Sequence, residues 1–226
     1  MNEKRTTTMD KRTIRILLVD DHPVLRRGVR DTLAAETDIE VCGEAGDAPA
    51  ALKLLETCRP DVAVVDISLE RDSGLELMRT IRTQHPEVKI LALSMHDDSL
   101  YAERVIRVGA LGYVNKSQPG DVLIRALRKV ADGEMVLSPD LTDQIVKRVV
   151  SVDGPPRTGI ASLSDRELQI FEFIGKGLVV REIAEQLCIS IKTVESHVEH
   201  IKTKLGMKSS RELVRRAALW IEGNMA

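Results

Sequence analysis

Short apolar runs alternate with amphipathic stretches along the first 133 residues of the chain. Each apolar run has the length of one strand, and each stretch between two runs repeats its apolar residues at helical spacing. The pattern predicts strands at 14–19, 39–44, 61–66, 88–93 and 111–114, and helices at 23–36, 48–58, 74–84, 99–108 and 119–132. Strand–helix pairs in this series predict a parallel sheet covered by helices on both faces.

The pattern after residue 133 is helical only. Ser138 and Pro139 begin a predicted helix over 139–150, and the Gly- and Pro-containing stretch 151–159 has no periodicity. Ser164 and Glu167 form a capping box, which predicts a helix start. The helices expected from there are 165–175, 180–187, 191–205 and 210–220. We therefore expect a flexible lead-in (1–13), an α/β domain (14–133), a linker helix with a flexible linker (134–160) and an all-α domain of four helices (161–226).

The composition limits the classes of function. Aromatic residues make up only 2% of the chain, so base stacking on an aromatic platform is not expected. The net charge is −2, and basic residues outnumber acidic ones only in the last part of the chain, which permits nucleic-acid binding. The cysteines have no metal or redox spacing. No apolar run reaches the length of a membrane span, and the polar N-terminus does not match a secretory signal. We expect a soluble, cytoplasmic protein without membrane partners.

Charged residues follow the predicted strands of the α/β domain. Asp20 and Asp21 follow the first strand, Asp66 ends the third, and Lys116 follows the fifth. The carboxyl ends of parallel strands meet at one edge of the sheet, where ligands bind. A single aspartate after a strand more often caps the next helix. The whole set, with each member at a strand end, favours a site for a divalent cation and a phosphoryl group.

Asp66 is the central residue of this candidate site. A carboxylate can take a phosphoryl group and form a mixed anhydride. Asp20 and Asp21 suit Mg²⁺, which would offset the charge of an anionic phosphoryl donor. Lys116 would supply a positive charge to the phosphoryl oxygens. Ser94, at the end of the fourth apolar run, can present a hydroxyl to the same group.

Motifs around these residues resemble a known family. They are Ile16–Val24 (ILLVDDHPV), Val64–Leu69 (VVDISL) with Gly74, Leu93–Ser94, and Gly112–Lys116 (GYVNK). Over residues 14–132 the chain resembles a response-regulator receiver domain. This implies a doubly wound, flavodoxin-like (βα)5 fold in which Asp66 accepts phosphate from a sensor histidine kinase. The resemblance also implies that Asp21 and Asp66 bind Mg²⁺ directly, and that Asp20 acts largely through water.

The resemblance assigns further roles to residues near Asp66. The main-chain carbonyl of Ser68 would complete the protein ligands of Mg²⁺, and Ser94 and Tyr113 would be the switch pair. Plain core packing is an alternative role for Tyr113. Family members often carry proline at the positions of Glu70 and Ser117. Because Glu70 lies near the expected kinase-docking and cation-binding surface, phosphorylation kinetics are not carried over from the family. Ser68 and His96 occupy positions that in the family influence the lifetime of the acyl phosphate, so this lifetime stays open.

A tight turn at Cys188–Ser190 separates two predicted helices of the C-terminal domain. The helix after it has one apolar stripe, formed by Ile191, Val194, Val198, Ile201 and Leu205, and a polar opposite face. Two short helices, a tight turn and a polar-faced helix predict a helix-turn-helix. The same periodicity also fits a bundle helix with a solvated face.

A second resemblance favours the helix-turn-helix. The residues that carry it are Leu163–Glu167, Gly177, Arg181–Glu185, Ile189–Ser190, Lys192–Val194, His197 and Lys204–Gly206. With these residues the chain resembles LuxR-type DNA-binding domains over 163–218. A receiver followed by this domain resembles a NarL/FixJ-type response regulator. The resemblance implies that helix 191–205 enters the major groove of promoter DNA. It also implies a homodimer that forms on phosphorylation and binds two half-sites.

The family comparison suggests which residues face the DNA. Residues near bases or phosphates would be Lys192, Thr193 and Ser196, and backbone candidates are Lys202, Lys204 and Lys208. Glu195 and Glu199 are acidic on the same side, so each must accept from a cytosine amine or pair within the helix, as Glu199 could with Lys202. The last helix would make the dimer contact, with Leu213, Ala217 and Trp220 as candidates, although Leu213 suits core packing equally well.

Two other functions fit part of the pattern. An aspartyl-phosphate phosphatase would also use Asp66 and Mg²⁺, but such phosphatases have a second aspartate two residues after the nucleophile, where this chain has Ser68. A DNA-binding protein with a vestigial receiver would not need the complete acidic set. We therefore expect a phosphorylation-switched transcription factor and not an enzyme.

Overall fold

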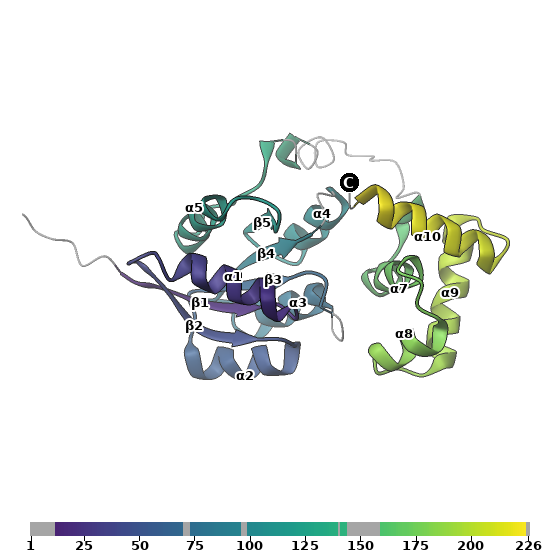
Figure 1. The fold of residues 1–226 in the computed structure, drawn as a ribbon, viewed down its shortest axis with the longest axis horizontal. Coiled ribbons are helices and arrows are strands. Elements are labelled where there is room, and N and C mark those ends of the chain that lie inside the picture. Colours follow the sequence, from purple (N-terminus) through teal and green to yellow (C-terminus); the bar gives the residue numbers. More distant parts are fainter. Residues whose placement is uncertain (1–11, 70–72, 96–98, 140, 144–158, 225–226) are drawn as a thin grey trace, which may run out of the picture.

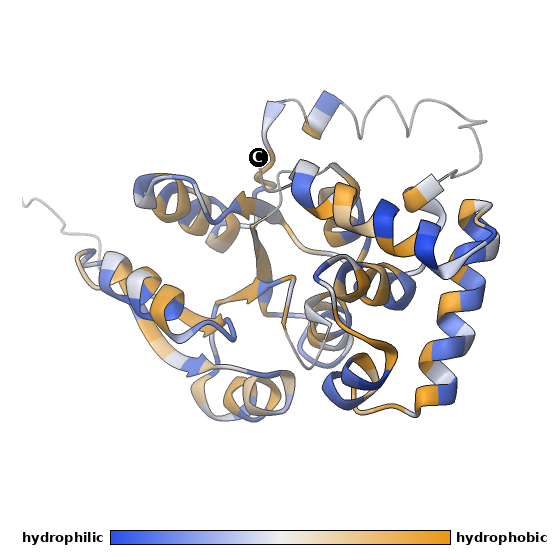
Figure 2. Cartoon of the chain, turned by 45° about the vertical axis from the view of Figure 1, so that its right-hand side comes forward, coloured by the Kyte–Doolittle hydropathy of each residue, from blue (hydrophilic) through white to orange (hydrophobic). Residues whose placement is uncertain are grey.

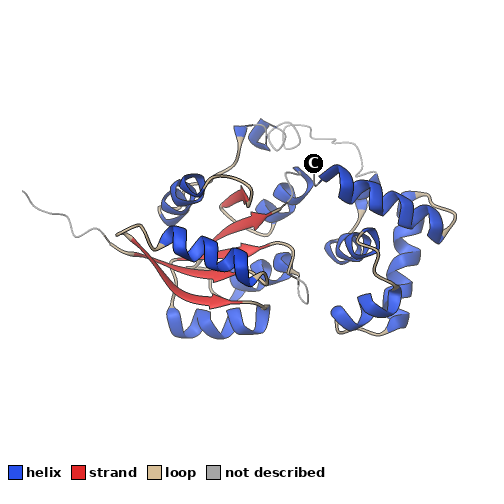
Figure 3. Ribbon diagram, in the orientation of Figure 1, coloured by secondary structure: helices blue, strands red, loops and turns tan. Residues whose placement is uncertain are grey.

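The computed structural model of the chain describes residues 12–69, 73–95, 99–139, 141–143 and 159–224. Its N-terminal domain alternates strands with helices, as Figures 1 and 3 show. The strands are β1 (Ile14–Val19), β2 (Ile39–Ala45), β3 (Val62–Asp66), β4 (Lys89–Ser94) and β5 (Gly112–Asn115). The helices are α1 (Pro23–Leu33), α2 (Ala48–Cys58), α3 (Gly74–Gln84), α4 (Ser99–Arg107) and α5 (Gly120–Ala131).

The strands form one parallel sheet in the order β2-β1-β3-β4-β5. Alternate residues of each strand point to opposite faces. Leu18 and Val64 lie in the apolar cluster with Leu33 of α1 and Leu127 of α5. The neighbouring residues, Val65 among them, belong to the other cluster, which includes the buried residues of α2, α3 and α4. The doubly wound flavodoxin-like architecture predicted from the sequence is confirmed.

Local signals position the helix ends close to the predicted ones. Asp47 accepts from the Ala50 amide at the start of α2, and Ser73 accepts from the Glu76 amide at the start of α3. The prediction was wrong at the end of α1, which stops at Leu33 and not at residue 36. The acidic residues of the connection that follows, Glu36 and Asp38, are bound by the guanidinium of Arg128 from α5, which is a tertiary contact.

The C-terminal domain is helical, as expected. It begins with a short 3-10 turn, η1 (Gly159–Ser162), followed by α7 (Asp165–Gly175), α8 (Val180–Gln186), α9 (Ile191–Leu205) and α10 (Ser210–Asn224). The capping box of Ser164 and Glu167 is present, and Ser190 caps α9. The final helix continues to Asn224, four residues beyond the predicted end, with Ile221 buried in the domain.

The predicted linker helix lies mostly outside the described residues. Residues 139 and 141–143 are helical, and Leu141 is buried, with its amide donating to the Ser138 hydroxyl. The lead-in to residue 11, positions 70 and 96, and the predicted interdomain linker up to residue 158 also lie outside the described part.

The helical domain packs against the carboxyl edge of the receiver sheet (Figure 1). Figure 2 shows hydrophobic strands inside the first domain and helices of mixed hydropathy in the second. One apolar cluster extends from the α2–α4 side of the sheet into the helical domain, through Tyr101 of α4 and Leu163 and Leu168 near the start of α7. The DNA-binding candidate helix, α9, lies on the far side of the helical domain from the sheet (Figure 1).

Candidate functional site

The residues predicted at the strand ends come together in the structure. Asp20 and Asp21 follow β1, Asp66 ends β3, Ser94 ends β4 and Lys116 follows β5. The Lys116 ammonium nitrogen lies 2.6 Å from Asp66 Oδ2 and 2.7 Å from Asp20 Oδ2. The side chains of these three residues are at most 2% exposed. One ammonium therefore bridges two buried carboxylates.

The charges around Asp66 do not balance. Burial raises the pKa of Asp66, while the Lys116 ammonium counteracts this and the Asp20 carboxylate adds to it. The amide of Ser68 donates to Asp66 Oδ1 at 3.1 Å, and the amide of His22 donates to Asp20 Oδ1 at 2.8 Å. With Asp21 included, three carboxylates face one ammonium, which favours binding of a further cation.

The donor set fits a hard divalent cation. Ligand atoms of Asp20, Asp21, His22 and Asp66 all lie within 4.8 Å of one another. Carboxylate oxygens are the ligands that Mg²⁺ prefers, with water completing its shell. Sequence reasoning missed His22, whose Nδ1 lies 2.8 Å from Asp21 Oδ1 and whose side chain is 60% exposed. The imidazole lies on the outer side of the pocket, where it contacts a predicted metal ligand.

Gly74 has a steric role that the motif alone did not reveal. A Cβ atom at this position would lie 2.0 Å from the main-chain oxygen of Asp66 and 2.8 Å from that of Ile67. Real Cβ atoms do not approach backbone this closely, so a larger residue would displace the chain just after the acceptor. Glycine lets α3 begin directly beside Asp66.

The predicted switch residues are both buried. Ser94 is fully buried at the end of β4, and Tyr113 is 6% exposed in β5. The amide of Lys116 donates to the Ser94 carbonyl at 2.7 Å, which ties the end of β5 to the end of β4. The burial of Tyr113 fits both roles considered for it, and its part in a switch stays a prediction.

Comparisons with known proteins agree with this geometry. Residues 16–128 match the family described as response regulator receiver domain, and residues 161–217 match the family of bacterial regulatory proteins, luxR family. The chain is 40% identical over 209 residues to the oxygen regulatory protein NreC of Staphylococcus aureus, and the match covers 90% of this chain and 96% of NreC. The chain is a NarL/FixJ-type response regulator. It belongs to a family of transcription factors and not of enzymes.

Solved structures of other response regulators are similar to this one. A LuxR-family response regulator from Aurantimonas is 36% identical, with a TM-score of 0.57, and the match covers 62% of this chain and 99% of that one. RcsB from Salmonella enterica serovar Typhimurium, solved with promoter DNA and the phosphomimetic BeF3⁻, is 25% identical, with a TM-score of 0.66. That match covers 91% of this chain and 98% of RcsB.

The polar face of α9 in this response regulator is open to solvent. The exposed residues include Lys192, Thr193, Glu195, Ser196 and Glu199, all predicted to lie near DNA. Lys208, just after α9, is exposed as well. Within the described part of the chain, neither Lys192 nor Lys208 has an ion pair, so both ammonium groups are available to phosphates. The DNA contacts themselves stay predictions.

Two of the predicted backbone lysines already have acidic partners. Lys202 Nζ lies 2.9 and 3.1 Å from the two carboxylate oxygens of Glu199, which is the intrahelical pair considered from the sequence. Lys204 Nζ lies 2.6 Å from Glu167 Oε2. Burial works to raise the pKa of Glu167, but hydrogen bonds from Lys204 and Ser164 outweigh it and lower the pKa. Each of these two lysines would have to divide its charge between its own glutamate partner and a DNA phosphate.

The dimer candidates on α10 have different surroundings. Leu213 and Ala217 are buried at 1% and 0% exposure, because α10 packs on α7. Core packing therefore accounts for both. Trp220 is partly buried, with its ring centroid 5.8 Å from that of Phe171 and 6.3 Å from that of Tyr101. No described helix is both long and apolar enough to cross a lipid bilayer.

Sequence reasoning also missed a buried carboxyl of the DNA-binding domain whose pKa is influenced by the acceptor. Glu172 of α7 is 7% exposed. Burial raises its pKa to about 8, Lys176 on the same helix works against this rise, and Asp66 across the interface adds to it. The helical period of α7 gave no signal for this burial or for the effect of Asp66, which belongs to the other domain.

We expect docking of the two domains to weaken as pH rises. The Glu172 pKa is about 8 when docked, against 4.5 for an ordinary glutamate. The docked form therefore holds a proton on Glu172 that the undocked form releases, and the contribution of Glu172 to docking is greatest below the ordinary pKa of 4.5. This contribution is lost as the pH rises toward the docked pKa of about 8. The docking constant falls by up to about tenfold per pH unit over this range. Small-angle scattering measured between about pH 6 and pH 8.5 tests this expectation.

Glu172→Gln is the matched variant for that titration, because it keeps the shape of the side chain and cannot ionise. Its scattering curve should be flat where the wild-type curve changes. Lys176 and Asp66, the charged groups that act on Glu172, are unaltered in this variant. Equal pH dependence in both proteins would show that another group controls docking.

Proposed function

We propose that this response regulator takes a phosphoryl group on Asp66 from a sensor histidine kinase, with Mg²⁺ bound, and that the modification switches dimerisation and DNA binding at promoter half-sites. The observation that carries the proposal is the buried group of Asp66, Asp20 and Lys116 at the carboxyl edge of the sheet. This arrangement combines a nucleophile, a fixed positive charge and an excess of carboxylates in one pocket.

The residues divide the chemistry between them. A carboxylate oxygen of Asp66 attacks the phosphorus, a P–O bond forms, and the P–N bond to the donor imidazole breaks as its electron pair returns to nitrogen. Lys116, held between Asp66 and Asp20, presents its ammonium to the phosphoryl oxygens. The Ser68 amide keeps Asp66 oriented through Oδ1. Mg²⁺, held by Asp20, Asp21 and Asp66 with the Ser68 carbonyl, would neutralise charge on the phosphoryl oxygens when bound.

The transfer must be followed by a change that reaches the DNA-binding domain. Ser94 would turn its hydroxyl toward the phosphoryl group, and Tyr113 would move with it. Both residues are buried in strands next to α4, and α4 contacts the helical domain. A charge added at Asp66 thus has a short physical path to the second domain.

The DNA-binding face of α9 supports the second half of the proposal. Its exposed residues come from one side of a helix whose other side buries Val194, Ile201 and Leu205. RcsB, a similar protein, was solved bound to promoter DNA. The basic excess of this domain is small, so one copy alone should bind weakly, and two copies on paired half-sites should bind more tightly.

We expect Lys192→Ala to weaken binding to any duplex and to reduce the dependence on salt. Loss of one phosphate contact lowers the slope of log affinity against log salt by about 0.9. Fluorescence anisotropy with labelled DNA at several salt concentrations measures the slope. Lys129→Ala removes an exposed lysine of α5 and serves as the control. An unchanged slope for Lys192→Ala would remove this lysine from the phosphate contacts.

The experiment that tests the proposed function is a comparison of oligomeric state and DNA affinity before and after treatment with acetyl phosphate and Mg²⁺. Sedimentation velocity should show a monomer converting to a dimer, and the affinity for promoter DNA should rise with it. Treated protein that stays monomeric and keeps its original DNA affinity would contradict the proposal.

A further inference from the structure

A second group of metal-ligating side chains lies in the helical domain, apart from the acceptor pocket. It consists of Glu167 of α7 with His197 and His200 of α9. A carboxylate oxygen of Glu167 and one ring nitrogen of each histidine all lie within 4.8 Å of one another. Among the described residues, only this group and the one around Asp66 bring three or more such ligands together. We call it the Glu–His–His cluster.

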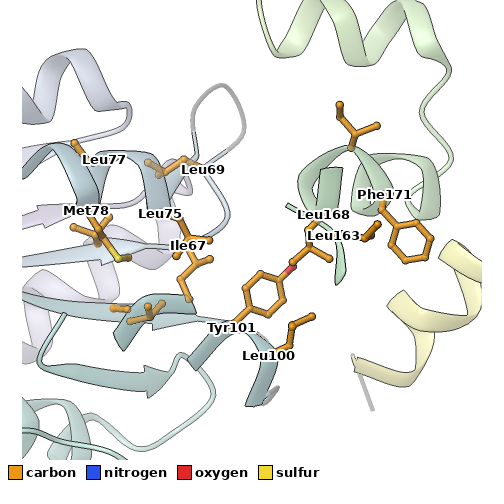
Figure 4. Close-up of a cluster of buried hydrophobic side chains, with 14 of the residues drawn as sticks. Ile67, Leu69, Leu75, Leu77, Met78, Leu100, Tyr101, Leu163, Leu168 and Phe171 are labelled. Atoms are coloured by element: carbon orange, nitrogen blue, oxygen red, sulfur yellow. The ribbon is translucent and has the colours of Figure 1, made fainter. Parts of the chain in front are cut away.

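Apolar packing fixes the two helices that carry the Glu–His–His cluster. Leu168 and Phe171 of α7 are buried in the apolar cluster that Figure 4 shows. Val194 and Ile201 of α9 belong to the same apolar cluster. The two histidines are three positions apart, so they lie on one face of α9, about one turn from each other. Because every ligand comes from a packed helix and none from a loop, the ligand geometry is largely set before an ion binds.

Local contacts hold Glu167 in place. The amide of Ser164 donates to Glu167 Oε2 at 2.7 Å, as part of the capping box. Lys204 Nζ lies 2.6 Å from the same oxygen. The other carboxylate oxygen, Oε1, takes part in neither contact. The Glu167 side chain is only 5% exposed, so its charge needs a cationic partner close by.

The two imidazoles supply nitrogen ligands. His197 is partly buried and His200 is exposed, so the cluster opens to solvent on the His200 side. Burial lowers the pKa of His197, the Glu167 carboxylate works against this change, and the charges of Arg166 and His200 add to it. The His197 imidazole is therefore mostly neutral at pH 7, which is the form that binds a metal ion. One carboxylate, two imidazoles and an open side for water match zinc sites with three protein ligands.

The ligand types separate this cluster from the acceptor pocket. Mg²⁺ prefers oxygen ligands, which the three aspartates at the sheet edge supply. Imidazole nitrogen suits zinc and the neighbouring first-row transition metals. The two groups should therefore bind different ions from the same solution.

Lys204 is the cation that Glu167 already holds. A dication on the same carboxylate would repel the ammonium at this short range. The Lys204 side chain is 39% exposed, so it can turn toward solvent when an ion enters. The metal ion and the Lys204 ammonium therefore compete for Glu167.

We propose that Glu167, His197 and His200 form a binding site for a first-row transition-metal dication, typified by Zn²⁺, which displaces the Lys204 ammonium from Glu167 and cross-links α7 to α9. The site does not depend on phosphorylation of Asp66. Binding stabilises the helical domain, because only the folded domain brings the three ligands together. It also releases a lysine near the end of α9 for contact with a phosphate, and this consequence alone rests on the proposed DNA binding.

Isothermal titration of the full-length, untagged chain with Zn²⁺, in excess Mg²⁺, tests the site. We expect one zinc ion per wild-type chain. His200→Asn removes a ligand from an exposed side chain, so folding is preserved. Its zinc affinity should fall by more than about tenfold, since even loss of an outer partner of a metal site costs that much. Lys204→Gln removes the competitor and should raise the affinity about two- to fivefold, the usual strength of a partly exposed ion pair.

Two controls make the test specific. His85→Asn is the matched variant, because His85 Nδ1 lies 3.8 Å from Glu87 Oε1 and His85 belongs to neither ligand group among the described residues. It should bind zinc like the wild type, and zinc should raise the melting temperature of both proteins but not that of His200→Asn. Titration with Co²⁺ reports the ligand type, because thiolate ligands add a near-ultraviolet band that imidazole and carboxylate do not give.

Each outcome decides one part of the proposal. Equal zinc affinity in wild type and His200→Asn would overturn the site. A thiolate band in the Co²⁺ spectrum would also overturn it, because the ion would then be held by cysteines. Zinc binding that disappears as Mg²⁺ is raised would place the ion in the acceptor pocket. Unchanged affinity in Lys204→Gln would overturn the displacement of the ammonium.

Discussion

Lys116→Met is expected to lower the free energy of unfolding by about 3–5 kcal/mol at neutral pH, the usual cost of removing one partner from a buried ion pair. The Lys116 ammonium lies within 2.7 Å of carboxylate oxygens of both Asp20 and Asp66. Methionine would fill its volume and leave two buried carboxylates facing each other. Urea unfolding followed by circular dichroism measures the loss.

Added Mg²⁺ and lower pH should both restore stability to this variant. The cation would replace the missing positive charge, and its gain in stability should exceed that of the wild type at the same concentration. Burial raises the pKa of Asp66, so protonation of this carboxylate at lower pH should reduce the difference from wild type. Lys53→Met, at an exposed lysine of α2, is the control and should respond to both treatments as the wild type does. A Lys116→Met chain as stable as wild type would show that the ion pairs of Lys116 with Asp20 and Asp66 do not stabilise the protein in solution.

Asp66→Asn is expected to remove every response of the protein to phosphodonors while leaving the domain folded. Burial raises the pKa of Asp66, so the ionised form is disfavoured in the folded state, and a neutral amide of the same shape relieves that cost. The variant should therefore be at least as stable as wild type at neutral pH. Its DNA affinity should equal that of the untreated wild type, with or without acetyl phosphate.

Asp61→Asn provides the comparison for this result. Asp61 is an acidic residue of the receiver at the opposite end of β3, where its carboxylate accepts from the amide of Arg15. The variant should respond to acetyl phosphate like wild type. A phosphate response that survives in Asp66→Asn would place the acceptor on another residue.

The meeting of the charged residues at the strand ends was predictable because it depends only on the order of strands and helices along the chain. Apolar runs locate the parallel strands, and their carboxyl ends must share an edge, so Asp20, Asp66 and Lys116 had to approach one another. The capping box at Ser164 and the cap at Ser190 are also local in sequence, and both are present.

Contacts between elements far apart in sequence were not predictable in the same way. Arg104 and Asp165 are 61 positions apart and belong to different domains, so no periodicity links them. The sequence predicts an ordinary solvent-facing glutamate at Glu172 on α7, whereas the side chain is buried in the structure. The pairing of Lys204 with Glu167 likewise follows from the packing of α9 on α7. These residues needed the fold before a role could be assigned.

The most direct test of the account is phosphate-affinity electrophoresis of the wild-type chain and Asp66→Asn after incubation with acetyl phosphate, with Mg²⁺ or with EDTA. The account predicts one retarded band, which appears only for wild type and only with Mg²⁺. A retarded band in Asp66→Asn, or one of equal intensity in EDTA, would contradict it.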